Sequence, residues 1–262
     1  MLMTIDVGNT NITVGIFDKQ KLVGNFRLTT GMTRTSDEFG TAIGEILRYN
    51  DIEKQDISDA IIASVVPKIM HSLTSGIIKY FEVHPILVEP GVRTGVKIIT
   101  ENPRQIGADR MSMPQAHWAC MADRRSSLIM VRRPPMIWSV QRGAYVSGVI
   151  APGIRTSAEA LWSKTAKLPE IEIRKPEHIL AKETISSMQA GLVYGQIGQT
   201  EYIVKHMIAE SGYEDIKVVA TGGLGNLISK ETDCINIYDP ELTLQGLRLI
   251  YEKEMKNRGA DR

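Results

Sequence analysis

One stretch near the N-terminus, residues 4–17, constrains the chain more than any other part of the sequence. Apolar residues lead into a short run of small and hydrogen-bonding residues, after which Ile12, Val14 and Ile16 return with a period of two. This alternation is typical of a β-hairpin with one buried face. We therefore expect two antiparallel strands joined by a tip at residues 8–11.

The tip of this expected hairpin has the chemistry of an anion site. Gly8 allows the backbone to come close to a ligand, and Asn9, Thr10 and Asn11 offer side-chain and main-chain donors. Asp6 precedes the tip, where its carboxylate could hold a hydrated Mg²⁺ against a bound anion. These residues predict a phosphate-binding hairpin.

The same tip residues also fit a hairpin turn that binds nothing, because glycine and asparagine are common in turns. The sequence contains neither the Walker loop nor the glycine-rich dinucleotide fingerprint, which place phosphate at a helix N-terminus. The local residues alone leave both interpretations open.

The length and charge of the chain exclude some classes of protein. With 262 residues it can form one large domain or two domains of roughly 100–150 residues each. The 31 basic and 30 acidic residues give a net charge of +1, so we expect no general attraction to nucleic acid or to an anionic membrane.

The cysteines and the N-terminus indicate a compartment. Cys120 and Cys234 lack a CxxC spacing, which fits reduced thiols in a cytosolic protein. The apolar start at residues 1–3 is too short for a signal peptide or a membrane span. We expect a soluble, cytoplasmic protein.

The first half of the chain predicts strands that alternate with helices. Beyond the hairpin, strands are expected at 21–29, 60–66 and 86–88, and helices at 35–50 and 68–81. Ser36 is the expected N-cap of the first helix. This order predicts a mixed sheet flanked by helices, which is an α/β domain.

The second half shows a similar alternation. The expected strands are 127–131, 144–150 and 216–221. Helices are expected from near Asp109 to residue 122, after the Pro-Gly turn as far as residue 161, at 184–208, after Gly222-Gly223 toward Ile228, and at 242–255. We predict two similar α/β lobes with a central cleft, divided near residue 115 into residues 1–115 and 116–262.

Asp109 and Arg110 end a polar loop where a helix is expected to begin. A helix N-terminus there could add its positive end to an anionic or hydroxyl-bearing ligand. Asp109 could equally be only an N-cap, with Arg110 a solvated charge.

Several motifs together resemble those of type III pantothenate kinases, which belong to the superfamily of acetate kinase, sugar kinases, Hsp70 and actin. The motifs span most of the chain and occur in the family's order and spacing. They are residues 6–11, 101–103 with 107–110, 148–154 with 157–161, 165–169, 188–195 and 221–223.

The resemblance implies an actin-like (ribonuclease H-like) enzyme with two lobes of mixed sheet flanked by helices. It implies transfer of the γ-phosphoryl group of ATP to the terminal hydroxyl of pantothenate, the first step of coenzyme A synthesis. It also implies a cytoplasmic homodimer that uses Mg²⁺ and a monovalent cation such as potassium or ammonium.

The resemblance further assigns roles to residues of this sequence. It implies that ATP phosphates contact Asp6, Val7, Gly8, Asn9, Thr10, Asn11, Ile12 and Thr13. Asp6 would organise Mg²⁺, and Gly222 and Gly223 would lie near the adenosine. Pantothenate would contact Gly107, Ala108, Asp109, Arg110 and Thr184. Asp109 would be the general base, and Arg110 suits the substrate carboxylate.

One block departs from the family. Where the family has an Asp that holds the monovalent cation and a Gly-Thr-Ala-Thr-like run, residues 132–138 read Arg-Arg-Pro-Pro-Met-Ile-Trp. The cation ligand is therefore lost at Arg132. Because proline lacks an N–H donor, Pro134 and Pro135 predict a distorted or disordered second hairpin.

Three explanations of this block stay open. Two compensating reading-frame shifts would scramble a short segment. Divergence would leave a weakened or non-catalytic homologue that acts as a binding or regulatory protein. Alternatively, an arginine replaces the cation in a working enzyme, because guanidinium stabilises phosphoryl charge. A sugar or acetate kinase is a weaker alternative, because residues 107–110 and 165–169 match the pantothenate enzymes better.

Overall fold

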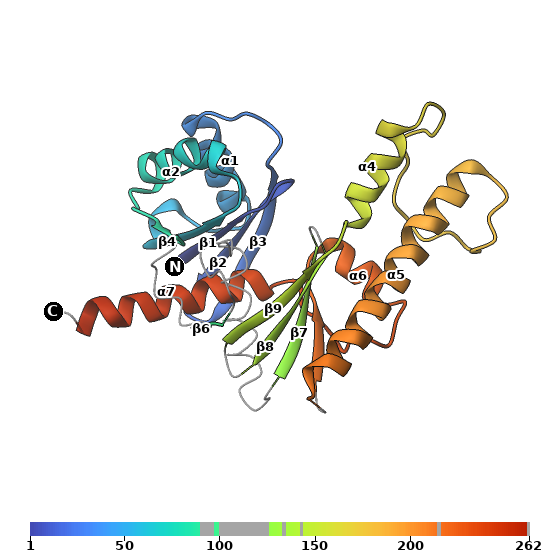
Figure 1. Cartoon of the computed structure of the whole chain (residues 1–262). Helices are drawn as coiled ribbons and strands as arrows, with labels where there is room; N and C mark the ends of the chain where they lie inside the picture. Colours follow the sequence, from blue (N-terminus) through green and yellow to red (C-terminus); the bar gives the residue numbers. More distant parts are fainter. Residues whose placement is uncertain (90–96, 100–125, 133–134, 142–143, 214–215, 261–262) are drawn as a thin grey trace. The chain divides into compact units, whose positions relative to one another are not determined.

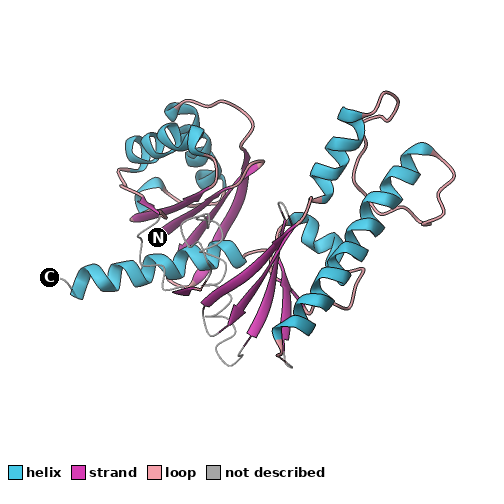
Figure 2. Cartoon of the chain, in the orientation of Figure 1, coloured by secondary structure: helices cyan, strands magenta, loops and turns pink. Residues whose placement is uncertain are grey.

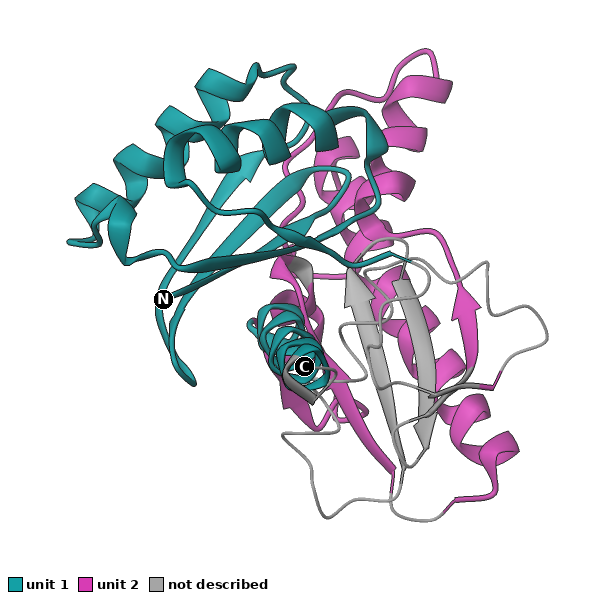
Figure 3. Ribbon diagram, turned by 90° about the vertical axis from the view of Figure 1, so that its left-hand side faces the viewer, with its two compact units in different colours: residues 1–97, 101–122, 241–262 teal, residues 98–100, 123–240 magenta. Residues whose placement is uncertain are grey.

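The structure, a computed structural model, describes residues 1–89, 97–99, 126–132, 135–141, 144–213 and 216–260 (Figure 1). The chain forms two compact units, coloured separately in Figure 3. The first comprises residues 1–97, 101–122 and 241–262, and the second comprises residues 98–100 and 123–240. Each unit combines strands with helices (Figure 2).

The sheet of the first unit has the strand order β3-β2-β1-β4-β5. Its strands are β1 (Leu2–Val7), β2 (Asn11–Asp18), β3 (Lys21–Thr29), β4 (Asp59–Ser64) and β5 (Ile86–Leu87). Strand β2 runs antiparallel to both β1 and β3, whereas β4 runs parallel to β1 and β5 runs parallel to β4. The predicted N-terminal hairpin and the predicted element order are confirmed.

The helices of the first unit are α1 (Ser36–Tyr49) and α2 (Pro67–Phe81), with a short 3-10 turn η1 (Lys54–Asp56) between them. The prediction that Ser36 caps α1 is wrong, because the cap is Thr35. The Glu38 N–H donates to the Thr35 hydroxyl at 3.3 Å, and the Thr35 N–H donates to Glu38 Oε2 at 2.7 Å. This reciprocal capping box satisfies two donors at the start of the helix.

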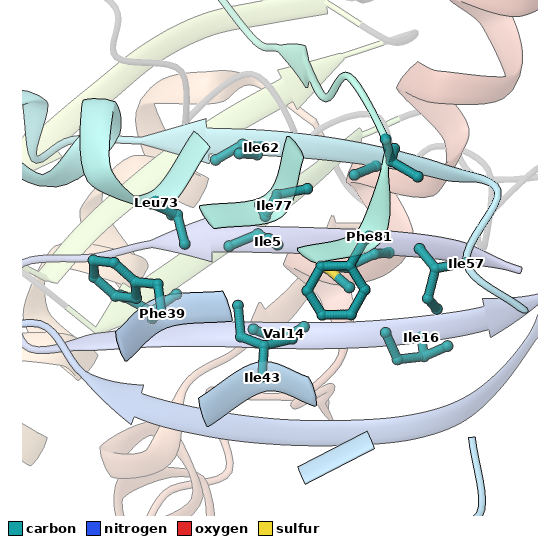
Figure 4. Close-up of a cluster of buried hydrophobic side chains, with 14 of the residues drawn as sticks. Ile5, Val14, Ile16, Phe39, Ile43, Ile57, Ile62, Leu73, Ile77 and Phe81 are labelled. Carbon is teal, nitrogen blue, oxygen red and sulfur yellow. The ribbon is translucent and has the colours of Figure 1, made fainter. Parts of the chain in front are cut away.

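One face of the first sheet packs against α1 and α2 (Figure 4). Alternate residues of each strand point to this side, as the period of two predicts. The cluster includes Ile5, Val14, Ile16 and Ile62 from the strands, and Phe39, Ile43, Leu73 and Ile77 from the helices. All of these side chains are buried.

The opposite face of the sheet is covered by α7 (Leu242–Ala260), which contacts β1, β2 and β4. Leu244, Leu247 and Ile250 of this helix are buried. A Cβ added at Gly15 would lie 2.9 Å from Leu244 Cδ1, so the helix packs closely against β2 at this glycine. This packing is why the C-terminal helix belongs to the first unit, whereas the sequence suggested a single division near residue 115.

The second unit has a sheet with the order β11-β10-β7-β8-β9-β6. Its strands are β6 (Lys97–Ile98), β7 (Ser126–Arg132), β8 (Pro135–Gln141), β9 (Ala144–Ile150), β10 (Ile216–Ala220) and β11 (Ile237–Tyr238). Its helices are α4 (Ile154–Lys164), α5 (Thr184–Ser211) and α6 (Gly223–Ser229). Strands β6, β8 and β11 were not predicted from the sequence.

The two sheets share a topology. In both, three consecutive strands form an antiparallel meander, and later strands add in parallel to the first strand of that meander. Thus β7, β8, β9, β10 and β11 repeat the pairing of β1, β2, β3, β4 and β5. The predicted similarity of two α/β lobes is visible in this strand order.

The second hairpin, β7–β8, corrects an expectation. The prolines were expected to distort it, but its antiparallel ladder runs without a shift from Ser126↔Gln141 to Arg132↔Pro135. Pro135 is the first residue of β8, a position at which a strand tolerates the missing N–H. Pro134 lies outside the described residues.

The two helices of the first unit cross at glycines, which leads to a stability prediction. A Cβ added at Gly76 of α2 would lie 2.5 Å from the backbone oxygen of Ser36. Because backbone cannot move aside cheaply, Gly76→Ala should lower the free energy of unfolding by about 1–3 kcal/mol. Urea unfolding followed by circular dichroism measures this change.

Gly191→Ala is the matched control, because Gly191 also lies inside a helix but has nothing within 4 Å of an added Cβ. Alanine should raise stability there by about 0.5–1 kcal/mol, since it is the better helix former. Equal stability of Gly76→Ala and the wild-type protein would contradict the described helix crossing.

Candidate phosphate-binding site

The tip of the β1–β2 hairpin comprises residues 8–11. The last ladder pair is Val7↔Ile12, and the Gly8 N–H then donates to the Asn11 carbonyl oxygen at 3.1 Å. Only Asn9 and Thr10 lie beyond this bond. Gly8 has little room for a side chain, because its Cβ would lie 3.3 Å from that same oxygen.

The backbone of this loop needs no left-handed residue. Neither Asn9 nor Thr10 is among the described residues with positive φ. Loops of four residues are most often built around a type I turn, which has negative φ throughout.

Thr30 contacts this loop from outside the hairpin, and sequence reasoning missed it. Its hydroxyl donates to the Gly8 carbonyl oxygen at 2.7 Å, and its N–H donates to the Thr10 carbonyl oxygen at 2.8 Å. The residue is 6% exposed. The sequence signal was indirect: β3 ends at Thr29, so the next residue lies beside the tip of the adjacent hairpin.

The bonds at the tip occupy its carbonyl oxygens. The carbonyl oxygens of Gly8, Thr10 and Asn11 each accept from a protein N–H or O–H group. In the part of the chain that the structure describes, no backbone carbonyl accepts from the N–H of Asn9 or Thr10. These two amides are therefore candidates to donate to an anionic ligand.

The edge of the sheet at this tip adds further positive potential. Because β1 and β4 are parallel, the tip and the end of β4 lie at the same edge, where the Val65 N–H donates to the Val7 carbonyl oxygen at 3.1 Å. Helix α2 begins two residues later at Pro67 and has no side-chain cap. Its N-terminus therefore carries uncapped N–H groups and the positive end of the helix dipole.

Asp6 is partly buried on β1, beside Thr13 of β2 and Ala63 of β4. Mg²⁺ usually keeps several waters and takes one or two carboxylates together with substrate phosphates. The carboxylate at the end of β1 fits that requirement. Among the described residues, no group of three or more His, Cys, Asp or Glu side chains could hold a metal ion by itself.

The expected adenosine-side residues lie in the second unit. Gly222 has φ 82° and ψ 163°, a conformation that essentially only glycine adopts. Its carbonyl oxygen accepts from the Tyr238 hydroxyl at 3.2 Å and from the Gly225 N–H at 3.1 Å. Gly223 begins α6, and the expected pantothenate contact Thr184 is the exposed first residue of α5.

The structure describes only some of the remaining predicted site residues. Gly107, Ala108, Asp109 and Arg110 lie outside the described residues. Arg132 is the last residue of β7, and the block that follows it continues into β8. Within the described helices, none is both long and apolar enough to span a membrane.

Comparison with known families decides the relationship. The sequence profile described as "Type III pantothenate kinase" matches residues 2–206. The chain belongs to the type III pantothenate kinase family. This confirms the family that the sequence motifs suggested.

Two relatives extend the match to almost the whole chain. A type III pantothenate kinase from Agathobacter rectalis is 52% identical over 254 residues, which cover 97% of this chain and 98% of that protein. A type III pantothenate kinase from Listeria welshimeri is 42% identical over 256 residues and 97% of each chain. Both matches cover nearly all of the relative's own length.

Solved structures with low identity share the fold. Component A of (R)-2-hydroxyglutaryl-CoA dehydratase from Acidaminococcus fermentans has a TM-score of 0.50 at 13% identity and covers 97% of this chain and 98% of its own. The ethanolamine utilization protein EutJ from Carboxydothermus hydrogenoformans has a TM-score of 0.52 at 13% identity and covers 95% and 89%. The predicted actin-like α/β fold class is confirmed.

Proposed function

We propose that this family member transfers the γ-phosphoryl group of ATP to pantothenate and releases 4′-phosphopantothenate, the first step of coenzyme A synthesis. The observation that carries the proposal is the 52% identity to a type III pantothenate kinase over 97% of the chain. The hairpin tip supports it independently, because its carbonyl groups accept protein donors, whereas no backbone carbonyl of the described residues accepts from the Asn9 or Thr10 amide.

The hairpin would bind the phosphates of ATP. Phosphoryl transfer asks the protein mainly to position the reacting groups and to stabilise negative charge. The amides of Asn9 and Thr10 and the uncapped N-terminus of α2 supply donors without a charged side chain. Residues 6–13 are therefore the proposed phosphate contacts.

Asp6 would hold Mg²⁺ through its bound waters or directly. When bound, the ion neutralises charge on the β- and γ-phosphates. Asp6 lies at the end of a buried strand that is paired on both sides, so its backbone is fixed. A carboxylate fixed in this way keeps the ion beside the tip.

The proposed pantothenate-binding residues are 107–110 and Thr184. Asp109 would accept the proton of the attacking hydroxyl as general base, and Arg110 would pair with the substrate carboxylate. Gly222 and Gly223 would lie near the adenosine. The backbone of Gly222 has a conformation that essentially only glycine adopts, so another residue at this position would change the path of the chain there.

The monovalent cation that other family members use does not fit residues 132–138. That segment contains no carboxylate, and two arginines begin it. We propose that an arginine supplies the positive charge instead, because guanidinium stabilises phosphoryl oxygens. The intact β7–β8 ladder supports a folded segment here. A cytoplasmic homodimer is proposed from the family relationship alone.

Asp109→Asn tests the assigned base. Asparagine keeps the size of the side chain but cannot accept the proton, so kcat should fall by about 10²- to 10⁴-fold. The measurement is formation of 4′-phosphopantothenate from ATP and pantothenate by the purified protein, followed by mass spectrometry.

Asp18→Asn is the control for this substitution, because Asp18 is an exposed carboxylate at the far end of β2. It should leave turnover unchanged. The Asp109→Asn variant should also keep the circular dichroism spectrum of the wild-type protein. Near-normal turnover by Asp109→Asn would disprove the assignment of the base.

The cation proposal is tested by measuring wild-type turnover in potassium and again in sodium. If an arginine replaces the ion, the two rates should be similar, because no site then distinguishes the cations. Turnover that requires potassium would contradict the proposal and would show that a cation site survives the altered block.

A further inference from the structure

Thr30 occupies a position from which a single residue controls the shape of the phosphate hairpin. It follows β3 directly, is 6% exposed, and uses both its side chain and its main chain on the neighbouring tip. One bond reaches Gly8, on the β1 side of the loop, and the other reaches Thr10 within the loop. The residue thus contacts both ends of the Gly8-to-Thr10 segment.

The two hydrogen bonds place different demands on the residue at position 30. The bond from the Thr30 N–H to the Thr10 oxygen, 2.8 Å, is available to any residue except proline. The bond from the hydroxyl to the Gly8 oxygen, 2.7 Å, needs a hydroxyl-bearing side chain. A carbonyl oxygen that is shielded from water and loses its donor destabilises the folded state, because it has neither a protein partner nor water, unless the backbone moves so that water can reach it.

The origin of the bonds explains why this tether matters. In the part of the chain that the structure describes, the hydrogen bonds that reach Gly8 and Thr10 from outside the hairpin are the two from Thr30. If the Gly8 carbonyl were released, the peptide units of the tip could rotate. The amides of Asn9 and Thr10 would then no longer point in one fixed direction.

We propose that Thr30 is a positioning residue for nucleotide binding: its hydroxyl fixes the Gly8 carbonyl so that the amides of the tip stay aligned for the phosphates of ATP. The inference rests on the proposed function of the hairpin. It assigns Thr30 no contact with substrate. The tether therefore acts on the affinity for nucleotide and not on the pantothenate side.

The test is Thr30→Val, which keeps the branched shape and removes the hydroxyl. Loss of this partly buried hydrogen bond should raise the KM for ATP, and the Kd for Mg²⁺ with a non-hydrolysable ATP analogue, by about tenfold. The KM for pantothenate should stay at the wild-type value. Thr30→Ser restores the hydroxyl and should return the nucleotide constants toward wild type.

Thr4→Val is the matched control. Thr4 lies on the same hairpin, is 0% exposed, and its hydroxyl donates to the Gly15 carbonyl oxygen at 3.2 Å. This variant loses the same kind of bond away from the tip, so it should lose stability without weakening nucleotide binding. If both valine variants raise the nucleotide constants equally, the effect is general and the proposal is wrong.

The outcomes separate this inference from the proposed function. Wild-type protein that binds the ATP analogue but does not phosphorylate pantothenate would refute the proposed function, while calorimetry on the Thr30 variants would still test the tether. Unchanged nucleotide affinity in Thr30→Val would refute the tether alone. If Thr30→Val does not fold, Thr30→Ala gives the same comparison without a buried branched side chain.

Discussion

Strand β1 is enclosed on every side, and the rest of the first unit is arranged around it. It pairs with β2 on one edge and with β4 on the other, so its backbone groups are bonded within the sheet. Alternate side chains face α1 and α2 or face α7. Asp6 and the hairpin tip lie at the carboxyl end of this strand. The site is therefore attached to a buried strand that is paired on both edges.

The C-terminal helix completes that enclosure. Arg248 of α7 is 8% exposed, places its guanidinium 5.7 Å from the centre of the Phe17 ring, and forms an ion pair with Glu252. Leu244 lies where Gly15 has no side chain. The first unit thus needs the last segment of the chain to bury the second face of its sheet, and it cannot be complete before that segment is made.

Short sequence patterns predicted the strands whose side chains alternate or are continuously apolar. The period of two in residues 12–16 gave the hairpin, and the continuous apolar run of β4 gave a strand buried on both faces. Strand β8 was missed because Pro135 and the preceding arginines hide its alternation. The packing of α7 and the bonds from Thr30 join residues far apart in sequence, and no local pattern encodes them. The role of Asp109 came from family resemblance, because a carboxylate beside an arginine is ambiguous by itself.

We propose that the amides of Asn9 and Thr10 donate to the phosphates of ATP. Backbone amide NMR of the labelled protein tests this contact, with Mg²⁺ and ATP in one titration and Mg²⁺ and adenosine in another. We expect these two resonances to move with ATP and to stay in place with adenosine. Resonances that stay in place while ATP binds, or that move equally with adenosine, would show that the amides do not contact the phosphates.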